Sequence, residues 1–392
     1  MLAENFHGSR QSILPVGGRT SLREEQQVAS KLPVILCTEH LNGLIDYPAR
    51  DMTVTVQAGM RVSELQTLLA GEHQQLPIDI PQAQQATIGG AIATNTSGSS
   101  RFGYGTFRDY VIGISAVDGQ GRLFSAGGRV VKNVAGYDLC KLMIGSMGTL
   151  GVITQVTLKL IPKPRCRMFV LAGCQHASIV EAALSTLNLS STRPVIMDLL
   201  NDKMAQQLQA ETGQQLPEEP YVLCIGYAGE TEETNWQTAA VAPELQSSQT
   251  GPPMVISGMA AENLWHGLTE AQSLSPAPCI FQATLLPSRV AAFVELCSQR
   301  GVAVQAYAGS GLVIGQLPDG CTNPQAAAQL LSPLREQAQG CGGSLSLLSG
   351  QDAGSVQRKL FETPFKGESL MRQLKTAFDP AGVLPPGQWQ TA

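Results

Sequence analysis

Residues 127–154 read GGRVVKNVAGYDLCKLMIGSMGTLGVIT, and six of them are glycines. Glycine at this density indicates a backbone that approaches another group closely or turns with a positive φ angle. Between the glycines we expect a short helix over 137–144, followed by an apolar strand over 152–160. Taken alone, the stretch fits two interpretations equally well: a large flat ligand lying against the main chain, or a glycine-rich hairpin corner that binds nothing.

Two other clusters of small residues lie upstream and favour the ligand. A short apolar strand, 13–16, runs into Gly17 and Gly18. Backbone N–H groups in such a turn can bind a phosphate, although an ordinary turn explains that segment alone more simply. Residues 87–100 read TIGGAIATNTSGSS and contain only two large side chains, which is little for a core helix. Flanking strands disfavour a flexible linker, so we expect this cluster to contact a ligand.

The region before residue 165 contains several strands and one clear helix. We expect strands over 31–36, 52–57 and 111–117, a hairpin turn over 118–121 with a return strand over 122–125, and a helix over 61–70 with Val62, Leu65, Leu68 and Leu69 on one face. The opening therefore looks βαβ-like. Arg108 and Asp109 are expected to form a surface ion pair. Pro162 and Pro164 mark a boundary between two predicted domains, 1–164 and 165–392.

The second domain alternates strands and helices more regularly. We expect strands over 168–172, 194–199, 221–227, 279–285, 302–308, 312–317 and 344–348. Helices are expected over 177–188, 201–211, 231–247, 259–272, 288–299, 323–339 and 368–378. The polar, proline-containing residues 246–253 are expected to form a loop.

Composition and residue spacing exclude several classes of function. The 392-residue chain has a net charge of −5, so nothing indicates a nucleic-acid partner. It has no apolar run of 18 residues for an integral membrane helix, and its first ten residues lack the apolar core of a signal peptide. The nine scattered cysteines indicate reduced thiols in a cytoplasmic protein and no iron–sulfur site within this chain. The five histidines are dispersed, so we predict no metal site.

The usual nucleotide signatures are also missing. No G-x-G-x-x-G follows a strand in the first domain, no G-x-x-x-x-G-K occurs, and Gly309 and Gly311 have no third glycine at the required place. A bound nucleotide would therefore be held in another way. The three clusters of small residues fit one long, flat, phosphate-containing ligand.

The order of these motifs resembles a known family. Five motifs, in this order, are similar to the FAD-binding domain of the vanillyl-alcohol oxidase/p-cresol methylhydroxylase (PCMH) superfamily. They are PVGGRT at 15–20, TIGGAIATN at 87–95, Arg108-Asp109, KNVAGYD at 132–138 and GSMGTLGVIT at 145–154. Within it, the resemblance is to the glycolate oxidase FAD-binding subunits of type E. It covers about 13–164, and the tail 374–384 matches the family's C-terminal signature, while the middle is weakly similar.

The resemblance implies a fold and a set of cofactor contacts. The fold would be α+β: a two-subdomain PCMH-type FAD-binding domain, then an α+β cap domain with an antiparallel sheet that is the FAD-linked oxidase C-terminal (substrate) domain. The pyrophosphate would contact Val16, Gly17, Gly18, Arg19 and Thr20. The pyrophosphate and isoalloxazine would be lined by Thr87, Ile88, Gly89, Gly90, Thr94 and Asn95. Adenosine and ribitol would lie near Gly145, Gly148, Gly151, Val152 and Ile153, and the flavin end near Tyr137 and Asp138.

The chain departs from the family pattern in several places. Relatives with covalent flavin use a histidine in one of these loops, and none lies in 13–20 or 74–164, so we expect non-covalent FAD. Relatives that oxidise α-hydroxy acids carry a His-rich segment that binds metal and takes the hydroxyl proton, but 305–312 here contains none. His266 is expected to be a packed helix residue, and the catalytic base stays unassigned. Only twelve residues precede Ile13, so we expect a late start or a trimmed first subdomain.

The resemblance implies an FAD-dependent oxidoreductase acting on the CH–OH group of a small 2-hydroxy acid, glycolate or D-lactate. The missing histidines suggest an accessory flavin subunit, with substrate oxidised on a sister flavin subunit and electrons passed to an iron–sulfur partner. Two alternatives remain open: a stand-alone FAD-dependent oxidase or dehydrogenase of another alcohol or hydroxy acid, and an assembly subunit that has lost FAD. We expect a cytoplasmic protein that reaches the inner membrane only through partners.

Overall fold

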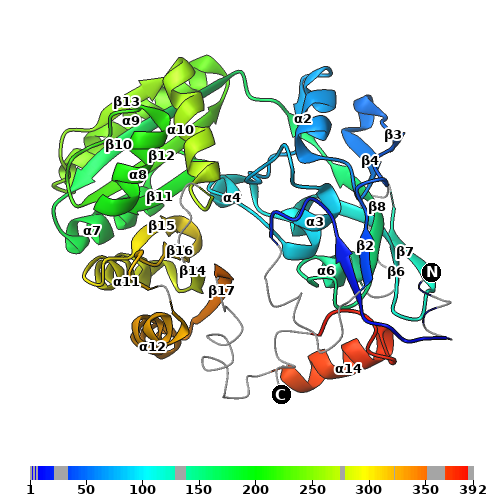
Figure 1. Ribbon diagram of the computed structural model, residues 1–392. Helices are drawn as coiled ribbons and strands as arrows, with labels where there is room; N and C mark the ends of the chain where they lie inside the picture. Colours follow the sequence, from blue (N-terminus) through cyan, green and yellow to red (C-terminus); the bar gives the residue numbers. More distant parts are fainter. Residues whose placement is uncertain are drawn as a thin grey trace. The chain divides into compact units, whose positions relative to one another are not determined.

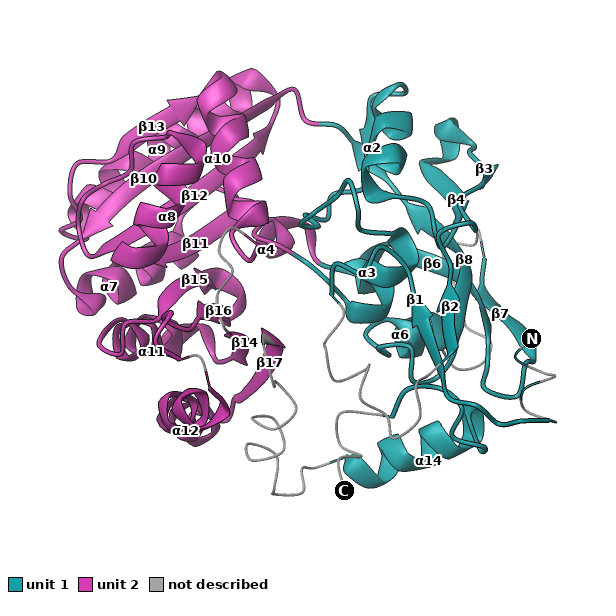
Figure 2. Cartoon of the chain, viewed as in Figure 1, with its two compact units in different colours: residues 1–97, 106–163, 361–392 teal, residues 98–105, 164–360 magenta. Residues whose placement is uncertain are grey.

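The computed structural model describes residues 2, 5, 8–21, 34–128, 138–273, 279–321, 323–350 and 367–386. The chain forms two compact units built from non-contiguous segments (Figure 2). Unit 1 comprises 1–97, 106–163 and 361–392, and unit 2 comprises 98–105 and 164–360. The proposed division into folding domains 1–164 and 165–392 stays a prediction.

Unit 1 is organised around a five-stranded antiparallel sheet (Figure 1). Its strands, in spatial order, are β3 (Leu44–Asp46), β4 (Thr53–Gln57), β8 (Val152–Lys159), β6 (Val111–Val117) and β7 (Leu123–Gly127). Two small sheets accompany it: β1 (Ile13–Val16) with β2 (Val34–Cys37), and β5 (Gln74–Gln75) with β9 (Ile161–Pro162). The first two strands, β1 and β2, pair parallel and are the only parallel pair within the described strands, whereas β4 pairs antiparallel with β8. The βαβ-like opening stays a prediction, because residues between β1 and β2 lie outside the described ones.

Short helices cover this sheet. They are η2 (Ala49–Asp51), α2 (Val62–Ala70), α3 (Ile88–Thr94), α5 (Phe107–Tyr110), α6 (Leu139–Met143) and α14 (Glu368–Phe378). Alternate residues of β4, Val54 and Val56, point into the same core as Leu65 and Leu69 of α2, and all four are fully buried. The strand period of two and the helix period of 3.6 therefore place apolar side chains on facing surfaces.

Helix α3 was not expected from its composition. Residues 88–94 contain two glycines and two alanines, yet Ile88 and Ile92 lie four residues apart and are fully buried. Gly89 lies so close to Ala58 that an added Cβ would be 2.6 Å from the Ala58 side chain. The small residues therefore serve close packing of a helix, which the sequence interpretation as a ligand-contacting loop missed.

Unit 2 contains an eight-stranded antiparallel sheet, which confirms the predicted fold class. In spatial order the strands are β13 (Met254–Ser257), β10 (Cys166–Cys174), β12 (Tyr221–Gly229), β11 (Ile196–Asn201), β15 (Ala303–Tyr307), β16 (Leu312–Gln316), β14 (Cys279–Thr284) and β17 (Ser344–Gly350). Strand β13 was not predicted, because it is a half-exposed edge strand directly after the expected loop.

The longer helices of unit 2 lie within a few residues of predicted ones, whereas the short helices at 101–104 and 308–310 were not predicted. The helix predicted over 368–378 belongs to unit 1. The helices of unit 2 are α4 (Arg101–Tyr104), α7 (Ala177–Leu189), α8 (Asp202–Thr212), α9 (Thr231–Ser247), α10 (Gly258–Glu270), η3 (Pro287–Arg289), α11 (Val290–Ser298), η4 (Ala308–Ser310) and α12 (Pro324–Gly340). One expectation about α10 is wrong: His266 is exposed, and its neighbour Trp265 packs in the core against Phe169. None of the described helices is long and apolar enough to cross a membrane.

Candidate functional site

The turn after β1 is packed tightly against the segment that precedes α3. A Cβ added to Gly17 would lie 2.2 Å from Thr87 Oγ1, and one added to Gly18 would lie 1.8 Å from the Gln85 carbonyl oxygen. Two of the three predicted clusters are therefore in direct contact, and only glycine fits at these two positions. Arg19 follows with a φ of 60°, which is unusual for a residue with a side chain.

The backbone N–H groups in the first turn of α3 are already hydrogen-bonded to other residues of unit 1. Ile88 N donates to Met60 O at 2.9 Å, and Gly89 N donates to Ala58 O at 2.6 Å. Gly90 N donates to the Oγ1 of the N-cap residue Thr87 at 3.3 Å. Because these donors are occupied, they are not available to a ligand.

The third cluster docks on that C-terminal end. Gly145 N donates to Ile92 O at 3.0 Å, and Met147 N donates to Ala93 O at 2.8 Å. Around this contact the backbone is left-handed at Asn95, with a φ of 52°, and at Met147, with a φ of 55°. Left-handed residues other than glycine are concentrated at functional sites because surrounding contacts must hold them.

Two buried polar atoms lie on the segments that meet here. Within the described part of the chain, Asn95 Oδ1 and Ser146 Oγ have no hydrogen-bond partner. A buried polar atom without a partner is unfavourable by about 1–3 kcal/mol, so such atoms call for an explanation. FAD carries hydroxyl and N–H donors that would satisfy such acceptors, so the residues present fit FAD. Thr94 differs, because its hydroxyl already donates to Gly90 O at 3.0 Å.

Other predicted site residues lie in the protein core or at its margin. Val16 is buried at the end of β1, Arg19 is exposed and Thr20 is half-buried. Val152 packs in a small core cluster with Ile13, and Ile153 belongs to the main core of unit 1. The remaining ones are two glycines of the third cluster. A Cβ added to Gly148 would lie 3.6 Å from the Pro15 side chain, and one added to Gly151 would lie 2.9 Å from Val117 O.

Asp138 has a local structural role, while Tyr137 lies outside the described residues. The Asp138 carboxylate caps α6 by accepting from Lys141 N at 3.1 Å, and it forms an ion pair with Lys141 Nζ at 3.2 Å. Burial acts to raise the pKa of Asp138, but the hydrogen bonds and charge of Lys141 and the charge of Arg108 outweigh it and lower the pKa. Asp138 is therefore a carboxylate at neutral pH.

The expected ion pair between Arg108 and Asp109 is replaced by two separate contacts. Asp109 Oδ2 accepts from Thr106 N at 2.8 Å and completes the capping box of α5. Arg108 Nη1 donates to Lys141 O at 3.2 Å, which ties α5 to α6. Neighbours on a helix point in different directions, so adjacent opposite charges seldom pair.

Unit 2 contains a buried polar cluster that includes Gln305, in the stretch where the resemblance led us to look for histidines. Asp198 Oδ2 accepts from Ser99 Oγ at 2.5 Å and from Gln305 Nε2 at 2.9 Å. Gln305 Nε2 also donates to Leu268 O at 3.1 Å, and all three side chains of the cluster are at most 1% exposed. In the described residues, no group of three His, Cys, Asp or Glu could hold a metal ion.

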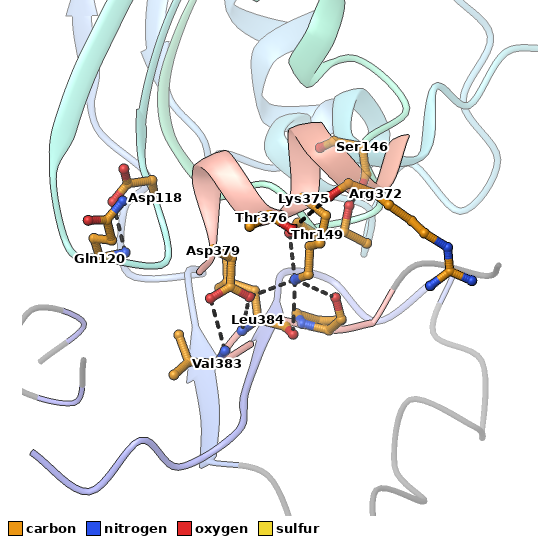
Figure 3. A network of polar contacts seen from close by, with 11 residues as sticks. Asp118, Gln120, Ser146, Thr149, Arg372, Lys375, Thr376, Asp379, Val383 and Leu384 are labelled. Atoms are coloured by element: carbon orange, nitrogen blue, oxygen red, sulfur yellow. Dashed lines mark hydrogen bonds and ion pairs between the residues drawn. The ribbon is translucent and has the colours of Figure 1, made fainter. Parts of the chain in front are cut away.

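Sequence reasoning missed a second polar cluster, near the C-terminus of unit 1 (Figure 3). Lys375 Nζ lies 2.6 Å from Asp379 Oδ2, with side chains only 5% and 0% exposed. The i,i+4 spacing of opposite charges just before a proline was visible in the sequence. Such spacing usually indicates a solvent-exposed pair, so burial of this one could not be read from it.

Comparison with known proteins agrees with this geometry. An FAD binding domain matches residues 4–127, and the C-terminal domain of FAD linked oxidases matches residues 163–389. "Glycolate oxidase subunit GlcD" of Bacillus subtilis is 27% identical over 377 residues, covering 91% of this chain and 79% of that protein. "D-2-hydroxyglutarate dehydrogenase" of Xanthomonas citri pv. viticola is 28% identical over 402 residues, covering 96% and 84%.

Two further matches bear on subunit type and on fold. "Glycolate oxidase subunit GlcE" of Escherichia coli is 37% identical, but over 127 residues that cover 32% of this chain and 36% of that protein. Among solved structures, alkyldihydroxyacetonephosphate synthase superposes with a TM-score of 0.66 at 16% identity, covering 98% of this chain and 74% of that one. At this identity the superposition shows a common fold and nothing about the reaction.

Proposed function

The chain belongs to the FAD-linked oxidases, and from this membership we propose that it is the FAD-binding subunit of a dehydrogenase complex that oxidises a small 2-hydroxy acid. Glycolate and D-lactate are the substrates we favour. Relatives named for glycolate oxidase and D-2-hydroxyglutarate dehydrogenase support a 2-hydroxy acid as the substrate class.

One observation carries the cofactor part of the proposal. Three glycine segments that are distant in sequence meet in unit 1, and the buried Asn95 Oδ1 and Ser146 Oγ have no partner in the described chain. Gly17 and Gly18 bring the end of β1 close to α3, and the left-handed turn at 145–148 places a polar loop on its C-terminal end. Bound FAD would supply the two-electron acceptor. We propose that it is held non-covalently, since these segments contain no histidine.

The subunit role is argued from unit 2. Gln305 and Tyr307 stand in the stretch where hydroxy-acid-oxidising relatives carry histidines, and both are fully buried. Tyr307 Oη accepts from Gln272 Nε2 at 2.9 Å. Neither a glutamine amide nor a tyrosine phenol provides the imidazole base that the resemblance implies at this stretch. We therefore assign substrate oxidation to a sister flavin subunit and the onward transfer of electrons to an iron–sulfur partner. This chain would then be an accessory flavin subunit, as in the resemblance to the type E subunits of glycolate oxidase.

A stand-alone dehydrogenase is the second candidate, and a specific observation favours it. The relatives GlcD and D-2-hydroxyglutarate dehydrogenase match more than nine-tenths of this chain, whereas the GlcE match covers a third of it. On this alternative the chain oxidises its own hydroxy acid or alcohol, with a base other than histidine in unit 2.

Purification of the chain alone and with its candidate partners separates these possibilities. We expect the chain alone to bind FAD with visible flavin absorbance and to give no dye reduction with glycolate or D-lactate. Turnover should appear when a sister flavin subunit and a Cys-rich iron–sulfur subunit are co-expressed in the cytoplasm. Robust turnover by the chain alone would establish the stand-alone enzyme instead, and a protein that stays colourless after reconstitution with FAD would reject both.

A further inference from the structure

The C-terminal segment 375–385 encloses a fully hydrogen-bonded ion pair. Besides Asp379, Lys375 Nζ donates to Thr149 O at 2.9 Å, Pro385 O at 3.0 Å and Leu384 O at 3.3 Å (Figure 3). The ammonium group has three N–H donors and four oxygens around it, so every donor is used. A buried ion pair is tolerated when its remaining donors and acceptors are satisfied in this way.

Asp379 organises the chain that follows it. Its Oδ1 accepts from Val383 N at 2.9 Å, and its Oδ2 accepts from Leu384 N at 2.8 Å. Val383 and Leu384 are thereby fixed with their side chains in an apolar cluster that also contains Ile13 and Val152. These two residues begin β1 and β8, the strands adjacent to the two glycine loops of the candidate FAD site.

The segment reaches both loops through the backbone as well. Ile13 N donates to Val383 O at 2.7 Å, which fixes the start of the strand leading to Gly17. On the other side, Lys375 holds the carbonyl of Thr149, the last residue of the 145–149 loop. Thr149 in turn donates from its hydroxyl to Ser146 O at 2.8 Å.

The 145–149 loop needs external support. Met147 has a φ of 55° and Gly148 a φ of 71°, and a left-handed residue other than glycine is unfavourable by about 1–2 kcal/mol. Two hydrogen bonds to α3 hold one side of the loop, and Lys375 holds the other. Because the loop carries Ser146, its conformation decides where that unpartnered hydroxyl is presented.

We propose that Lys375 is a positioning residue for FAD: by holding the Thr149 carbonyl, it keeps the 145–149 loop in the cofactor-binding conformation. The inference rests on the proposed FAD site. It means that the C-terminal segment, 226 residues away from Thr149 in sequence, sets the affinity of unit 1 for its cofactor. Lys375 contacts neither substrate nor cofactor in this role.

A double variant, Lys375→Met with Asp379→Asn, tests the role without leaving a buried charge. Methionine fills the space of the lysine stem, and asparagine keeps one oxygen for Val383 N or Leu384 N. The matched control is Arg372→Met on the same helix, where Arg372 is half-exposed and pairs with Glu368. For each protein, urea unfolding of the apoprotein and titration of apoprotein with FAD give stability and affinity separately.

We expect the double variant to bind FAD at least about ten-fold more weakly than the natural chain, equivalent to about 1.4 kcal/mol, while Arg372→Met binds as tightly as the natural chain. A folded double variant with unchanged FAD affinity would overturn the inference. If the natural chain itself binds no FAD, the proposed function has failed, so the two failures are distinguishable.

Hydrogen exchange on the natural chain provides a test that does not depend on the variant folding. Coupling between two sites is reciprocal, so FAD must slow amide exchange in 375–385 if that segment supports the FAD loop. We expect slower exchange there and in 145–149, with no change in Ala177–Leu189 of α7 as the reference. Unchanged exchange of 375–385 at saturating FAD would contradict the proposal.

Discussion

At the scale of single residues, the turn after β1 has no space for a side chain. A Cβ on Gly18 would lie 1.8 Å from a backbone oxygen of Gln85, and backbone cannot rotate away as a side chain can. We predict that Gly18→Ala lowers the free energy of unfolding by about 1–3 kcal/mol, the range for overpacking. It should also weaken FAD binding, as measured by urea unfolding and by FAD titration.

Gly340→Ala is the matched control for that substitution. A Cβ at Gly340 meets nothing within 4 Å, and its backbone is not left-handed. It ends helix α12, where alanine is favourable. Stability of the Gly18→Ala variant equal to that of Gly340→Ala would show that the turn adjusts freely.

The buried cysteines should be chemically silent in the folded protein. Burial raises the pKa of Cys140 to about 11, and it raises the pKa of Cys174 and of Cys297 to about 12. The thiolate is the reactive form, so a raised pKa leaves it nearly absent at neutral pH. Iodoacetamide at neutral pH should therefore alkylate exposed Cys37 and spare these three, as read by peptide mass spectrometry.

Denaturant provides the control for this prediction. In the unfolded chain the thiols return to ordinary pKa values and become accessible, so all of them should react. Alkylation of Cys297 in the native protein at the rate seen for Cys37 would show that the core of α11 opens readily.

At the scale of elements, α3 depends on its N-cap and on close packing more than on helix propensity. Thr87 Oγ1 accepts from Gly90 N, and the helix has only seven residues, of which two are glycine. We predict that Thr87→Ala lowers the free energy of unfolding by about 1 kcal/mol. Thr87→Ser, which keeps the hydroxyl, should retain most of that stability.

Urea unfolding of the two variants gives the measurement. If Thr87→Ala and Thr87→Ser are equally stable, the hydroxyl does not cap α3. A loss of FAD affinity in the alanine variant alone would further link the start of α3 to the position of Asn95 at its end.

At the scale of the whole molecule, the chain leaves unit 1 after Ser97 and returns to it at Thr106. The intervening residues are held in unit 2 by Ser99, whose hydroxyl donates to buried Asp198, and by the Gly103 N–H, which donates to Val195 O at 3.1 Å. We predict that Ser99→Ala lowers the stability of unit 2 by about 1–3 kcal/mol, because the buried carboxylate loses a donor. Thermal or urea unfolding measures the change.

Ser332→Ala is the control, since Ser332 is an exposed residue of α12 whose hydroxyl donates to Ala328 O of its own helix. It should change stability by less than about 0.5 kcal/mol. Equal stability of the two variants would mean that the buried cluster adds nothing beyond the packing of α4 on β11.

The sequence by itself indicated most of the longer elements and the three glycine clusters. Strand β8 alternates with a period of 2 residues, and the apolar face of α2 repeats every 3.6 residues. Each pattern involves only residues that are close in sequence, so it can be recognised without the fold. The order of motifs likewise indicated FAD, and the structure brings Gly17, Gly18 and Asn95 together with the loop at 145–148. The assignments of these residues to parts of the cofactor stay predictions.

Only the tertiary structure decided which distant residues support the site. Helix α3 forms from a glycine-rich stretch because Ala58 and Met60 accept its first N–H groups, and no local pattern records that docking. The contact of Lys375 with Thr149 spans 226 residues, and that of Gln305 with Ser99 spans 206. Such pairings form only when the completed fold buries both partners together. For the same reason, the i,i+4 spacing of Lys375 and Asp379 in the sequence does not reveal whether solvent or protein surrounds the pair.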